Sequence, residues 1–296
     1  MILIDGKKIA ADIRSELKNE IDKLKQEGKK VPGLVTILVG NNPASEIYVS
    51  SKGKACEEIG MLTKSEKHSE TISEKELLDL VESYNNNPDY NGILVQLPLP
   101  KHIDEDKVIE AISPKKDVDG FHPVSIGNLV IGKDTFASCT PAGIQELLIR
   151  YGIETEGKHV VVLGRSNIVG KPIANIMLQK KKFANSVVTI CHSGTKDVSY
   201  FTKQADILIA AIGRANFVKE DMVKDGVVVV DVGINRLEDK SKTKGYRICG
   251  DVDFENVSKK ASYITPVPGG VGPMTIAMLL KNTYKAYLMY GESRVI

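Results

Sequence analysis

The apolar positions near the start of the chain recur at helical spacing, at Ile9, Ile13, Leu17, Ile21 and Leu24. This spacing predicts an amphipathic helix that ends at Gly28. Strands are then predicted at 34–39, 62–68 and 92–97, with helices between them at 43–59 and 74–84. Because strands that alternate with helices favour parallel pairing, residues 1–138 are predicted to form one α/β domain.

The middle of the chain has little periodicity. Residues 113–138 contain several prolines and glycines, and we predict a long loop there, a kind of segment that is often functional. Thr140 and Pro141 are the residue types preferred at an N-cap and at the first helical position, so a helix is predicted from Thr140 to Arg150.

The second half contains four nearly unbroken apolar runs, at 159–163, 186–190, 206–211 and 226–231. Such runs suit a parallel sheet covered on both faces. We therefore predict an α/β protein with two lobes, in which 139–274 form a doubly wound, Rossmann-like domain. The last helix, from about Met274 to Tyr290, is expected to pack back on the N-terminal lobe, leaving a cleft, so 275–296 are assigned with 1–138.

The segment from His159 to Met177 has the pattern of a strand, a turn from Gly164 to Gly170 and a helix opened by Pro172. Glycines there let the backbone approach a phosphate, and the free N–H groups of the helix start can hold it. An ATPase-type loop does not fit, because five residues separate the glycines and Pro172 replaces the hydroxyl that binds magnesium. A dinucleotide site and a turn that binds nothing remain as alternatives.

The next strand, Val187 to Ile190, decides the expected cofactor. NAD-binding proteins commonly place an Asp or Glu at its end, whereas this chain continues with Cys191-His192-Ser193-Gly194. No carboxylate is present to repel a 2′-phosphate, and Arg165, Ser166, His192 and Ser193 can donate hydrogen bonds to one. NADP is therefore the preferred ligand.

Composition narrows the class of protein. At 296 residues, two domains are the default, and 42% hydrophobic residues suffice for real cores. The net charge of +2 comes from 40 basic and 38 acidic residues that are mixed along the chain, which argues against nucleic-acid and membrane partners. The four cysteines lie far apart and are expected to be reduced thiols in the cytoplasm. No metal site is expected, because none of the five histidines pairs at helical spacing.

Three smaller groups could carry chemistry. Tyr48 and Lys52 lie one turn apart on a predicted helix, so a ring and an amine share one face. Gln96 ends a strand, at the edge of the sheet where ligands bind in such folds. Either carboxylate of Asp117 and Asp119 could bind an N–C–N edge with both oxygens. Each group also has an ordinary structural reading, as a solvated helix pair, a strand-end amide and a charged turn.

Together, six motifs in order resemble the bifunctional methylenetetrahydrofolate dehydrogenase/methenyltetrahydrofolate cyclohydrolase family, and the match spans nearly the whole chain. They are Ser45-x-x-Tyr48-x-x-x-Lys52, Gln96-Leu97-Pro98-Leu99-Pro100, Lys116-Asp117-Val118-Asp119-Gly120, Cys139-Thr140-Pro141-x-Gly143, Gly164-Arg165-Ser166-x-x-Val169-Gly170-x-Pro172 and Pro266-Val267-Pro268-Gly269-Gly270-Val271-Gly272-Pro273-Met274-Thr275. Two departures are visible: Ser125 stands where the family often has Asn, and Ser138 where it often has Pro.

The resemblance implies NADP-dependent oxidation of methylenetetrahydrofolate and hydrolysis of the product to 10-formyltetrahydrofolate, in the one-carbon metabolism that serves purine biosynthesis. It implies that Lys52 is the acid–base residue, that Gln96 orients it, that Tyr48 stacks on the folate and that Asp119 holds the pterin. Pro268, Gly269 and Gly270 would line the folate site. The implied cofactor-binding set is Gly164, Arg165, Ser166, Val169, Gly170, His192, Ser193, Ile234 and Thr275. A homodimer formed through the nucleotide domain is also implied.

Two alternatives stay open at this point. One is another two-lobed NADP dehydrogenase that acts on a small acid, resembling shikimate dehydrogenase. The other is a nucleotide-sensing protein without turnover, which the presence of Lys52, Gln96 and Asp119 argues against.

Overall fold

The computed structural model describes residues 1–239, 241 and 245–291, and the chain divides into two units. The six-stranded unit contains Met1–Ala10 and Ser138–Thr275, and the three-stranded unit contains Ala11–Ala137 and the residues from Ile276 onward. Two helices, α1 (Gly6–Gln26) and α10 (Val271–Ala286), contribute residues to both units.

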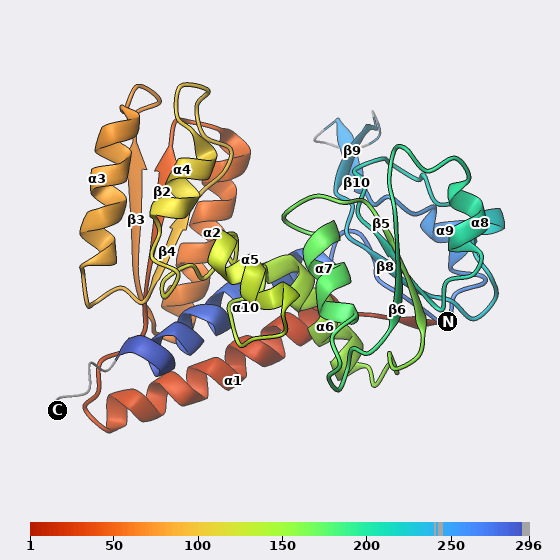
Figure 1. The fold of residues 1–296 in the computed structure, drawn as a ribbon, viewed down its shortest axis with the longest axis horizontal. Helices are drawn as coiled ribbons and strands as arrows, with labels where there is room; N and C mark the ends of the chain where they lie inside the picture. Colours follow the sequence, from red (N-terminus) through yellow and green to blue (C-terminus); the bar gives the residue numbers. More distant parts are fainter. Residues whose placement is uncertain (240, 242–244, 292–296) are drawn as a thin grey trace. The chain divides into compact units, whose positions relative to one another are not determined.

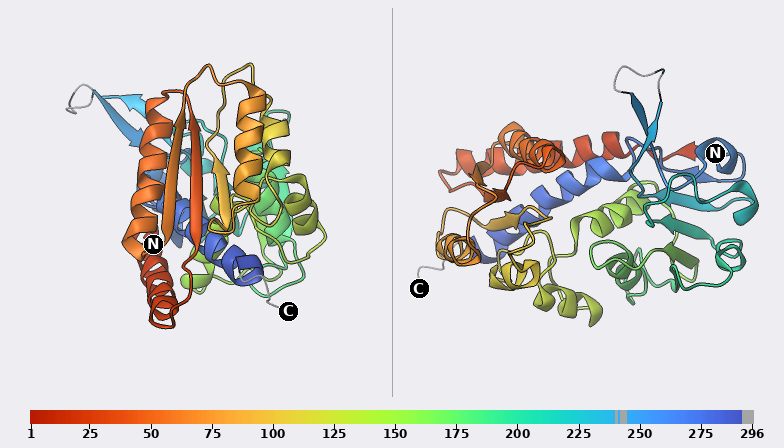
Figure 2. Two further views of the ribbon diagram at one scale, coloured as in Figure 1. Left: turned by 90° about the vertical axis from the view of Figure 1, so that its left-hand side faces the viewer. Right: turned by 90° about the horizontal axis from the view of Figure 1, so that it is seen from above.

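The three-stranded unit has a parallel sheet with β2 (Gly33–Val39) in the centre, between β3 (Leu62–His68) and β4 (Gly92–Val95). β2 is buried along its whole length. Its side chains at Val35, Ile37 and Val39 pack in a core with α3 (Glu74–Asn85), while α2 (Pro43–Ile59) covers the other face (Figure 2). The strands β2 and β4 are therefore buried between helices, whereas β3 forms a more exposed edge of the sheet.

Local capping explains where the helices of this unit begin. Ser73 and Glu76 form a reciprocal capping box at the start of α3. Asp104 accepts hydrogen bonds from two backbone N–H groups of α4 (Glu105–Ala111).

The C-terminal helix α10 belongs to this unit from Ile276, and Asn282 donates to the carbonyl oxygen of Val118 at 2.8 Å. A π-helical turn, Tyr287–Gly291, follows it.

The six-stranded unit is built on a wholly parallel sheet in the order β1-β11-β8-β7-β5-β6 (Figure 1). Its strands are β1 (Ile2–Leu3), β5 (His159–Leu163), β6 (Val187–Cys191), β7 (Ile207–Ala210), β8 (Val228–Asp231) and β11 (Tyr263–Ile264). The order reverses between β5 and β7, which is the switch point where doubly wound folds bind ligands. The doubly wound, Rossmann-like class predicted for this half is confirmed.

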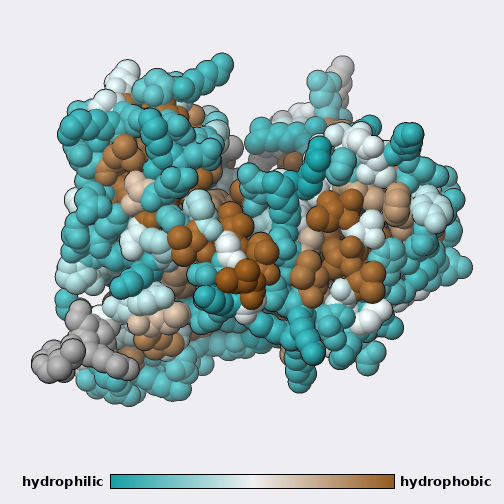
Figure 3. Space-filling view, in the orientation of Figure 1, coloured by the Kyte–Doolittle hydropathy of each residue, from teal (hydrophilic) through white to brown (hydrophobic). Residues whose placement is uncertain are grey.

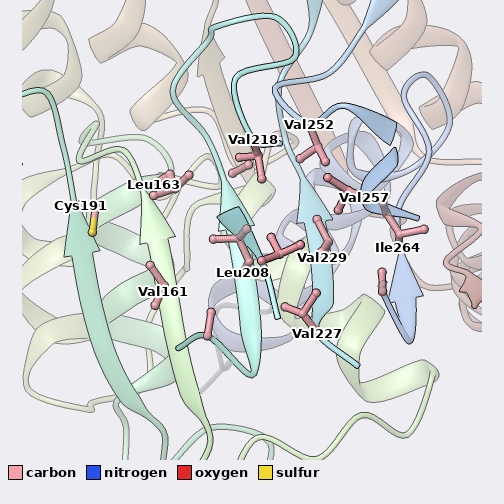
Figure 4. Close-up of a cluster of buried hydrophobic side chains, with 14 residues drawn as sticks. Val161, Leu163, Cys191, Leu208, Val218, Val227, Val229, Val252, Val257 and Ile264 are labelled. Carbon is pink, nitrogen blue, oxygen red and sulfur yellow. The ribbon is translucent and has the colours of Figure 1, made fainter. Parts of the chain in front are cut away.

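One hydrophobic cluster of the six-stranded unit packs on one face of this sheet (Figure 4), and the alternate side chains of the strands, such as Val160, Val162 and Ile209, are buried as well. Val161, Leu208 and Val229 come from three adjacent strands, and Val218 and Val257 pack against them from the connecting segments. The helices around the sheet are α6 (Cys139–Arg150), α7 (Gly170–Met177), α8 (Val198–Thr202) and α9 (Phe254–Val257), with a 3-10 turn at Glu220–Met222. Among the described residues, no helix is both long enough and apolar enough to cross a bilayer.

Some boundaries differ from those that the sequence predicted. Residues 1–10, predicted with the N-terminal domain, belong to the six-stranded unit, because β1 pairs with β11 at the edge of the large sheet. The expected loop at 113–138 contains the helix α5 (Pro123–Val130), whose first turn is capped by Nδ1 of His122. A hairpin of β9 (Asn235–Glu238) and β10 (Tyr246–Cys249) was not predicted either.

The start of α6 was also misplaced by the sequence. The N-cap residue is Ser138 instead of Thr140, and its hydroxyl does not cap the helix. Ser138 Oγ donates instead to the carbonyl oxygen of Ile168 at 2.7 Å, which ties the start of α6 to the glycine turn.

Candidate functional site

The glycine turn after β5 is a crowded backbone crossing. Gly164 has a φ of +112°, and a Cβ built on it would overlap the carbonyl oxygen of Ala211. A Cβ on Gly170 would overlap the carbonyl oxygen of Gly164. Only glycine can occupy these two positions, because three stretches of backbone meet there. The helix α7 begins at Gly170, two residues before the predicted start at Pro172.

Ser166 closes this turn. Its Oγ accepts hydrogen bonds from the backbone N–H groups of Val169, at 3.1 Å, and Gly170, at 3.3 Å. Val169 and Gly170 were predicted to bind the cofactor, and in the structure they shape the turn and are not among the residues that line the pocket beside it. A direct contact of Val169 and Gly170 with the cofactor therefore stays a prediction.

A pocket of about 490 Å³ lies beside the turn, at the carboxyl ends of β5, β6 and β7. Five predicted cofactor-binding residues line it, namely Gly164, Arg165, Ser166, His192 and Ser193. None of its lining residues is an aspartate or glutamate. The pocket therefore suits an anionic ligand, as expected for a phosphorylated cofactor.

The end of β6 fixes the tautomer of His192. The backbone N–H of Gly194 donates to His192 Nδ1 at 3.0 Å, and the backbone N–H of His192 donates to Thr195 Oγ1 at 3.0 Å. With Nδ1 acting as an acceptor, the ring proton of neutral His192 is on Nε2. Nε2 is then a donor, which agrees with the hydrogen-bonding role expected for this residue.

Sequence reasoning missed eight of the thirteen residues that line this pocket. The additional lining residues are Leu163, Cys191, Thr195, Val198, Ala211, Ile212, Arg214 and Phe217. Four of them follow β7, the neighbour of β5 across the switch point. The predicted strand at 206–211 could have pointed to these four residues, because in a doubly wound sheet the segment that follows such a strand borders the ligand.

The remaining predicted nucleotide-unit residues lie outside this pocket. Ile234 is 55% exposed, just before β9. The hydroxyl of Thr275 lies 2.9 Å from that of Thr140. In the segment that contains Pro268, Gly269 has a φ of +110° and its carbonyl oxygen accepts a hydrogen bond from the backbone N–H of Lys7.

Gly270 makes a similarly close approach. A Cβ on Gly270 would lie 2.6 Å from the carbonyl oxygen of Pro266, and a Cβ on Gly6 would overlap the carbonyl oxygen of Gly270. The segment is therefore held closely against the start of α1 within the six-stranded unit, and its glycines are required there by packing.

The three-stranded unit holds the predicted catalytic pair. Lys52 lies on α2 and is 8% exposed, and its Nζ donates to Gln96 Oε1 at 3.0 Å. Gln96 follows the last residue of β4, and its own Nε2 donates to the carbonyl oxygen of Leu97 at 2.7 Å. Both ends of the amide are therefore engaged, and its oxygen faces the amine. The predicted contact between Lys52 and Gln96 is present in the structure.

The other predicted folate-binding residues, Tyr48 and Asp119, differ in how far their side chains are exposed to solvent. Tyr48 lies one turn before Lys52 on α2 and is 48% exposed, so its ring is open to a ligand. Of the two carboxylates in the 116–120 motif, Asp117 is 2% exposed and accepts hydrogen bonds from the backbone N–H groups of Phe121 and His122. Asp119 is only partly buried. The sequence left either carboxylate open for ligand binding, and Asp117 is committed to the protein interior.

Burial dominates the electrostatics of Asp117. Loss of solvent raises the pKa of its carboxyl to about 6, although hydrogen bonds from Ser125, His122 and Phe121 act in the opposite direction. Ser125, the departure from the family pattern in this segment, is thus a hydrogen-bond donor to Asp117. Ser138, the other departure, is the residue that contacts the glycine turn through Ile168.

Two sequence models of one family match the chain in succession. The catalytic-domain model of tetrahydrofolate dehydrogenase/cyclohydrolase matches residues 4–119, and the NAD(P)-binding-domain model of the same family matches residues 138–290. The chain belongs to the tetrahydrofolate dehydrogenase/cyclohydrolase family. The resemblance drawn from the six motifs is confirmed, and the alternatives of a small-acid dehydrogenase and a sensing protein fall away.

Full-length relatives of this family are similar to the chain. The bifunctional protein FolD of Chloroherpeton thalassium is 58% identical over 289 residues, covering 97% of this chain and 98% of the relative. The bifunctional protein FolD of Prosthecochloris aestuarii is 59% identical over 290 residues, with the same coverage.

Solved structures of the family agree with the fold. The FolD methylenetetrahydrofolate dehydrogenase/cyclohydrolase of Campylobacter jejuni is 52% identical, with a TM-score of 0.92, covering 98% of this chain and 99% of that one. The enzyme of Trypanosoma brucei, solved with NADP cofactor and inhibitor, is 38% identical with a TM-score of 0.91 and covers 98% of both chains.

Proposed function

We propose that this chain oxidises methylenetetrahydrofolate with NADP⁺ and hydrolyses the resulting methenyltetrahydrofolate to 10-formyltetrahydrofolate, within one-carbon folate metabolism. The observation that carries this proposal is the buried Lys52–Gln96 pair, which lies in a chain of the tetrahydrofolate dehydrogenase/cyclohydrolase family. A lysine that is 8% exposed and has an amide oxygen at 3.0 Å can exchange a proton with a bound substrate.

The hydrolytic step needs a residue that accepts and returns a proton. Water adds to the carbon of the N–C–N cation, and the proton that the water releases passes to the neutral amine of Lys52. The bond from this carbon to N5 then breaks as N5 takes up the proton that Lys52 holds. The hydroxyl of the adduct loses its own proton to solvent, so the carbon remains on N10 as a formyl group and one proton is released overall. Gln96 holds the amine through its Oε1, so that Nζ keeps one position during both proton transfers.

The oxidative step depends more on alignment than on acid–base chemistry. Loss of hydride from a carbon between two nitrogens leaves a delocalised cation, and no base is required for it. Bound NADP⁺ supplies the hydride acceptor. Tyr48, with its exposed ring, is proposed to stack on the folate, and Asp119 to bind the pterin. The backbone of Pro268, Gly269 and Gly270 is proposed to border the folate site.

The residues of the 490 Å³ pocket fit NADP. Gly164 and Gly170 allow the close backbone crossing that a Cβ would block, and Gly164 with Arg165 and Ser166 lines the pocket where we propose that the phosphates bind. Arg165, Ser166, His192 and Ser193 are proposed to hold the phosphorylated ribose. Val169 and Gly170 shape the turn, and we propose that Ile234 and Thr275 contact other parts of the cofactor.

The oligomeric state and the location of the enzyme are further proposals. We propose a homodimer that forms through the nucleotide-binding unit. Support comes from apolar side chains gathered over α7 and the edge strand β6 (Figure 3), where Ile168, Leu178, Val187 and Ile190 are exposed. We also propose that the enzyme works in the reducing cytoplasm, which the four free, buried cysteines support.

A coupled absorbance assay tests the function. Methylenetetrahydrofolate and NADP⁺ are added to the purified chain, and NADPH and methenyltetrahydrofolate are followed separately. We expect NADPH to accumulate while the methenyl signal stays low, because hydrolysis removes the intermediate. Formation of NADPH with accumulation of methenyltetrahydrofolate at its uncatalysed decay rate would reject the hydrolytic activity. The absence of both signals would reject the proposal as a whole.

A further inference from the structure

Arg214 lines the nucleotide pocket but comes from a different loop than the glycine turn. It follows β7, whereas Arg165 follows β5, and both are lining residues of the 490 Å³ pocket. The guanidinium carbon of Arg214 lies 4.6 Å from the centre of the Phe217 ring. Among the residues that the structure describes, no side chain forms a hydrogen bond or an ion pair with this guanidinium.

The backbone of Arg214 is fixed independently of its side chain. The backbone N–H groups of Ile212, Gly213 and Arg214 all donate to the carboxylate of Asp251, at 2.8, 2.9 and 2.8 Å. Asp251 is fully buried. This carboxylate thus holds the loop after β7, and a change of the Arg214 side chain leaves these hydrogen bonds in place.

The orientation of Arg214 favours an anion over a flat base. One face of a guanidinium that lies on an aromatic ring is already stacked, and its N–H edges remain free to donate. Those edges match the paired oxygens of a phosphate. Arg214 and Arg165 are both arginines in a pocket whose lining contains no carboxylate, so neither charge is neutralised by the pocket itself.

We propose that Arg214 is a specificity-determining residue, which binds the 2′-phosphate of NADP together with Arg165 and thereby selects NADP over NAD. The proposal rests on the function given above. Phe217 acts as the support that holds the guanidinium with its N–H edge toward the phosphate.

Calorimetric binding of cofactor fragments to the full-length protein tests this role without turnover. The probes are 2′,5′-ADP and 5′-AMP, which differ only in the 2′-phosphate. Arg214→Gln should weaken binding of 2′,5′-ADP by about tenfold or more, because a charge-assisted contact is lost. Binding of 5′-AMP should change by less than about twofold. Arg214→Lys, which keeps the charge without the paired N–H groups, should fall between the wild type and Arg214→Gln.

Arg236→Gln is the matched control. Arg236 also lies over a ring, at 4.9 Å from that of Tyr246, but it belongs to the β9–β10 hairpin and does not line the pocket. The Arg236→Gln variant should bind 2′,5′-ADP and 5′-AMP as the wild type does. The same variants are compared for kcat/KM with NADP⁺ and NAD⁺, where only Arg214→Gln and Arg214→Lys should lower the ratio.

Three results would overturn the proposal. If Arg214→Gln lost affinity equally for 2′,5′-ADP and 5′-AMP, Arg214 would contact the part that the fragments share. If neither affinity changed, Arg214 would not contact the cofactor. If the wild-type protein bound both fragments equally well, it would have no preference for the 2′-phosphate that Arg214 could explain. A wild type that prefers 2′,5′-ADP but has no dehydrogenase activity would reject the proposed function while leaving the role of Arg214 intact.

Discussion

Asp251→Asn is expected to destabilise the nucleotide pocket although it changes a single atom. In the wild type, Oδ2 accepts hydrogen bonds from the N–H groups of Ile212 and Gly213, and Oδ1 accepts them from Arg214 and from Asn235 Nδ2. An asparagine has only one oxygen. Whichever way its amide is turned, the NH₂ group faces two donors and cannot accept from them.

The cost follows from these two lost hydrogen bonds. A hydrogen bond to a charged acceptor contributes about 1.5–3 kcal/mol, so two of them amount to about 3–6 kcal/mol. Asp251 is fully buried, so water cannot take over the lost contacts. The substitution also relieves a repulsion on Asp231. Burial is the main cause that raises the pKa of Asp231 to about 6, and the negative charge of Asp251 is a further cause. We therefore expect the lower end of the range.

Thermal unfolding followed by circular dichroism measures the effect. A loss of about 3 kcal/mol corresponds to a decrease in Tm of about 6 °C or more for a unit of this size. Affinity for 2′,5′-ADP should also fall, because residues of the released loop line the pocket. The control is Asp253→Asn, which removes a partly exposed contact to Lys219 and should cost at most about 1 kcal/mol. The reasoning would be refuted if the Tm of Asp251→Asn lay within about 2 °C of the wild-type Tm and close to the Tm of the Asp253→Asn control.

Three further outcomes are expected. Asp119→Asn should raise the KM for methylenetetrahydrofolate about tenfold or more, since a charge-assisted contact to the pterin is lost, and steady-state kinetics equal to wild type would count against that contact. Arg165→Ala should lower the ratio of kcat/KM for NADP⁺ over NAD⁺, and an unaltered ratio would remove Arg165 from the phosphate site. For Asp117, burial raises the folded-state pKa to about 6, above its unfolded value near 3.8. Its contribution to stability is therefore full below about pH 4 and is lost as the pH rises through about 6, by up to roughly 3 kcal/mol. Asp117→Asn should remove this component from the pH dependence of the unfolding free energy, and identical pH profiles of the two proteins would contradict it.

Much of the fold followed from apolar patterning together with the alternation of strands and helices along the chain. The helix at Pro43–Ile59 and the strand at Leu62–His68 were predicted with the bounds that the structure gives. Periodicity failed where an element is short or is stabilised from far away in sequence. β1 has two residues and exists through pairing with β11, some 260 residues away, and no local pattern carries that information. α5 was missed because Pro123 and Gly127 were read as loop residues, whereas His122 caps the helix and Pro123 is its first residue.

The candidate site was predictable to the extent that motifs encode it. The glycine turn and the contact between Lys52 and Gln96 were anticipated from residue types and spacing. The fates of Asp117 and Asp119 could not be separated by sequence, because both are carboxylates in one short motif and only the fold decides which is buried. Arg214 was missed because its place in the pocket depends on the order of the strands and on the hydrogen bonds to Asp251.

Lys52→Met gives the most direct test of the account, through one measurement, the enzyme-dependent loss of methenyltetrahydrofolate absorbance. Methionine keeps much of the apolar length of the side chain and removes the amine, so the protein should fold and bind 2′,5′-ADP as the wild type does. Because a positioned acid–base group contributes about 10²–10⁴-fold, the hydrolysis rate should fall by at least about 10². Hydrolysis within twofold of the wild-type rate would contradict the central claim that the buried amine on α2 transfers the proton.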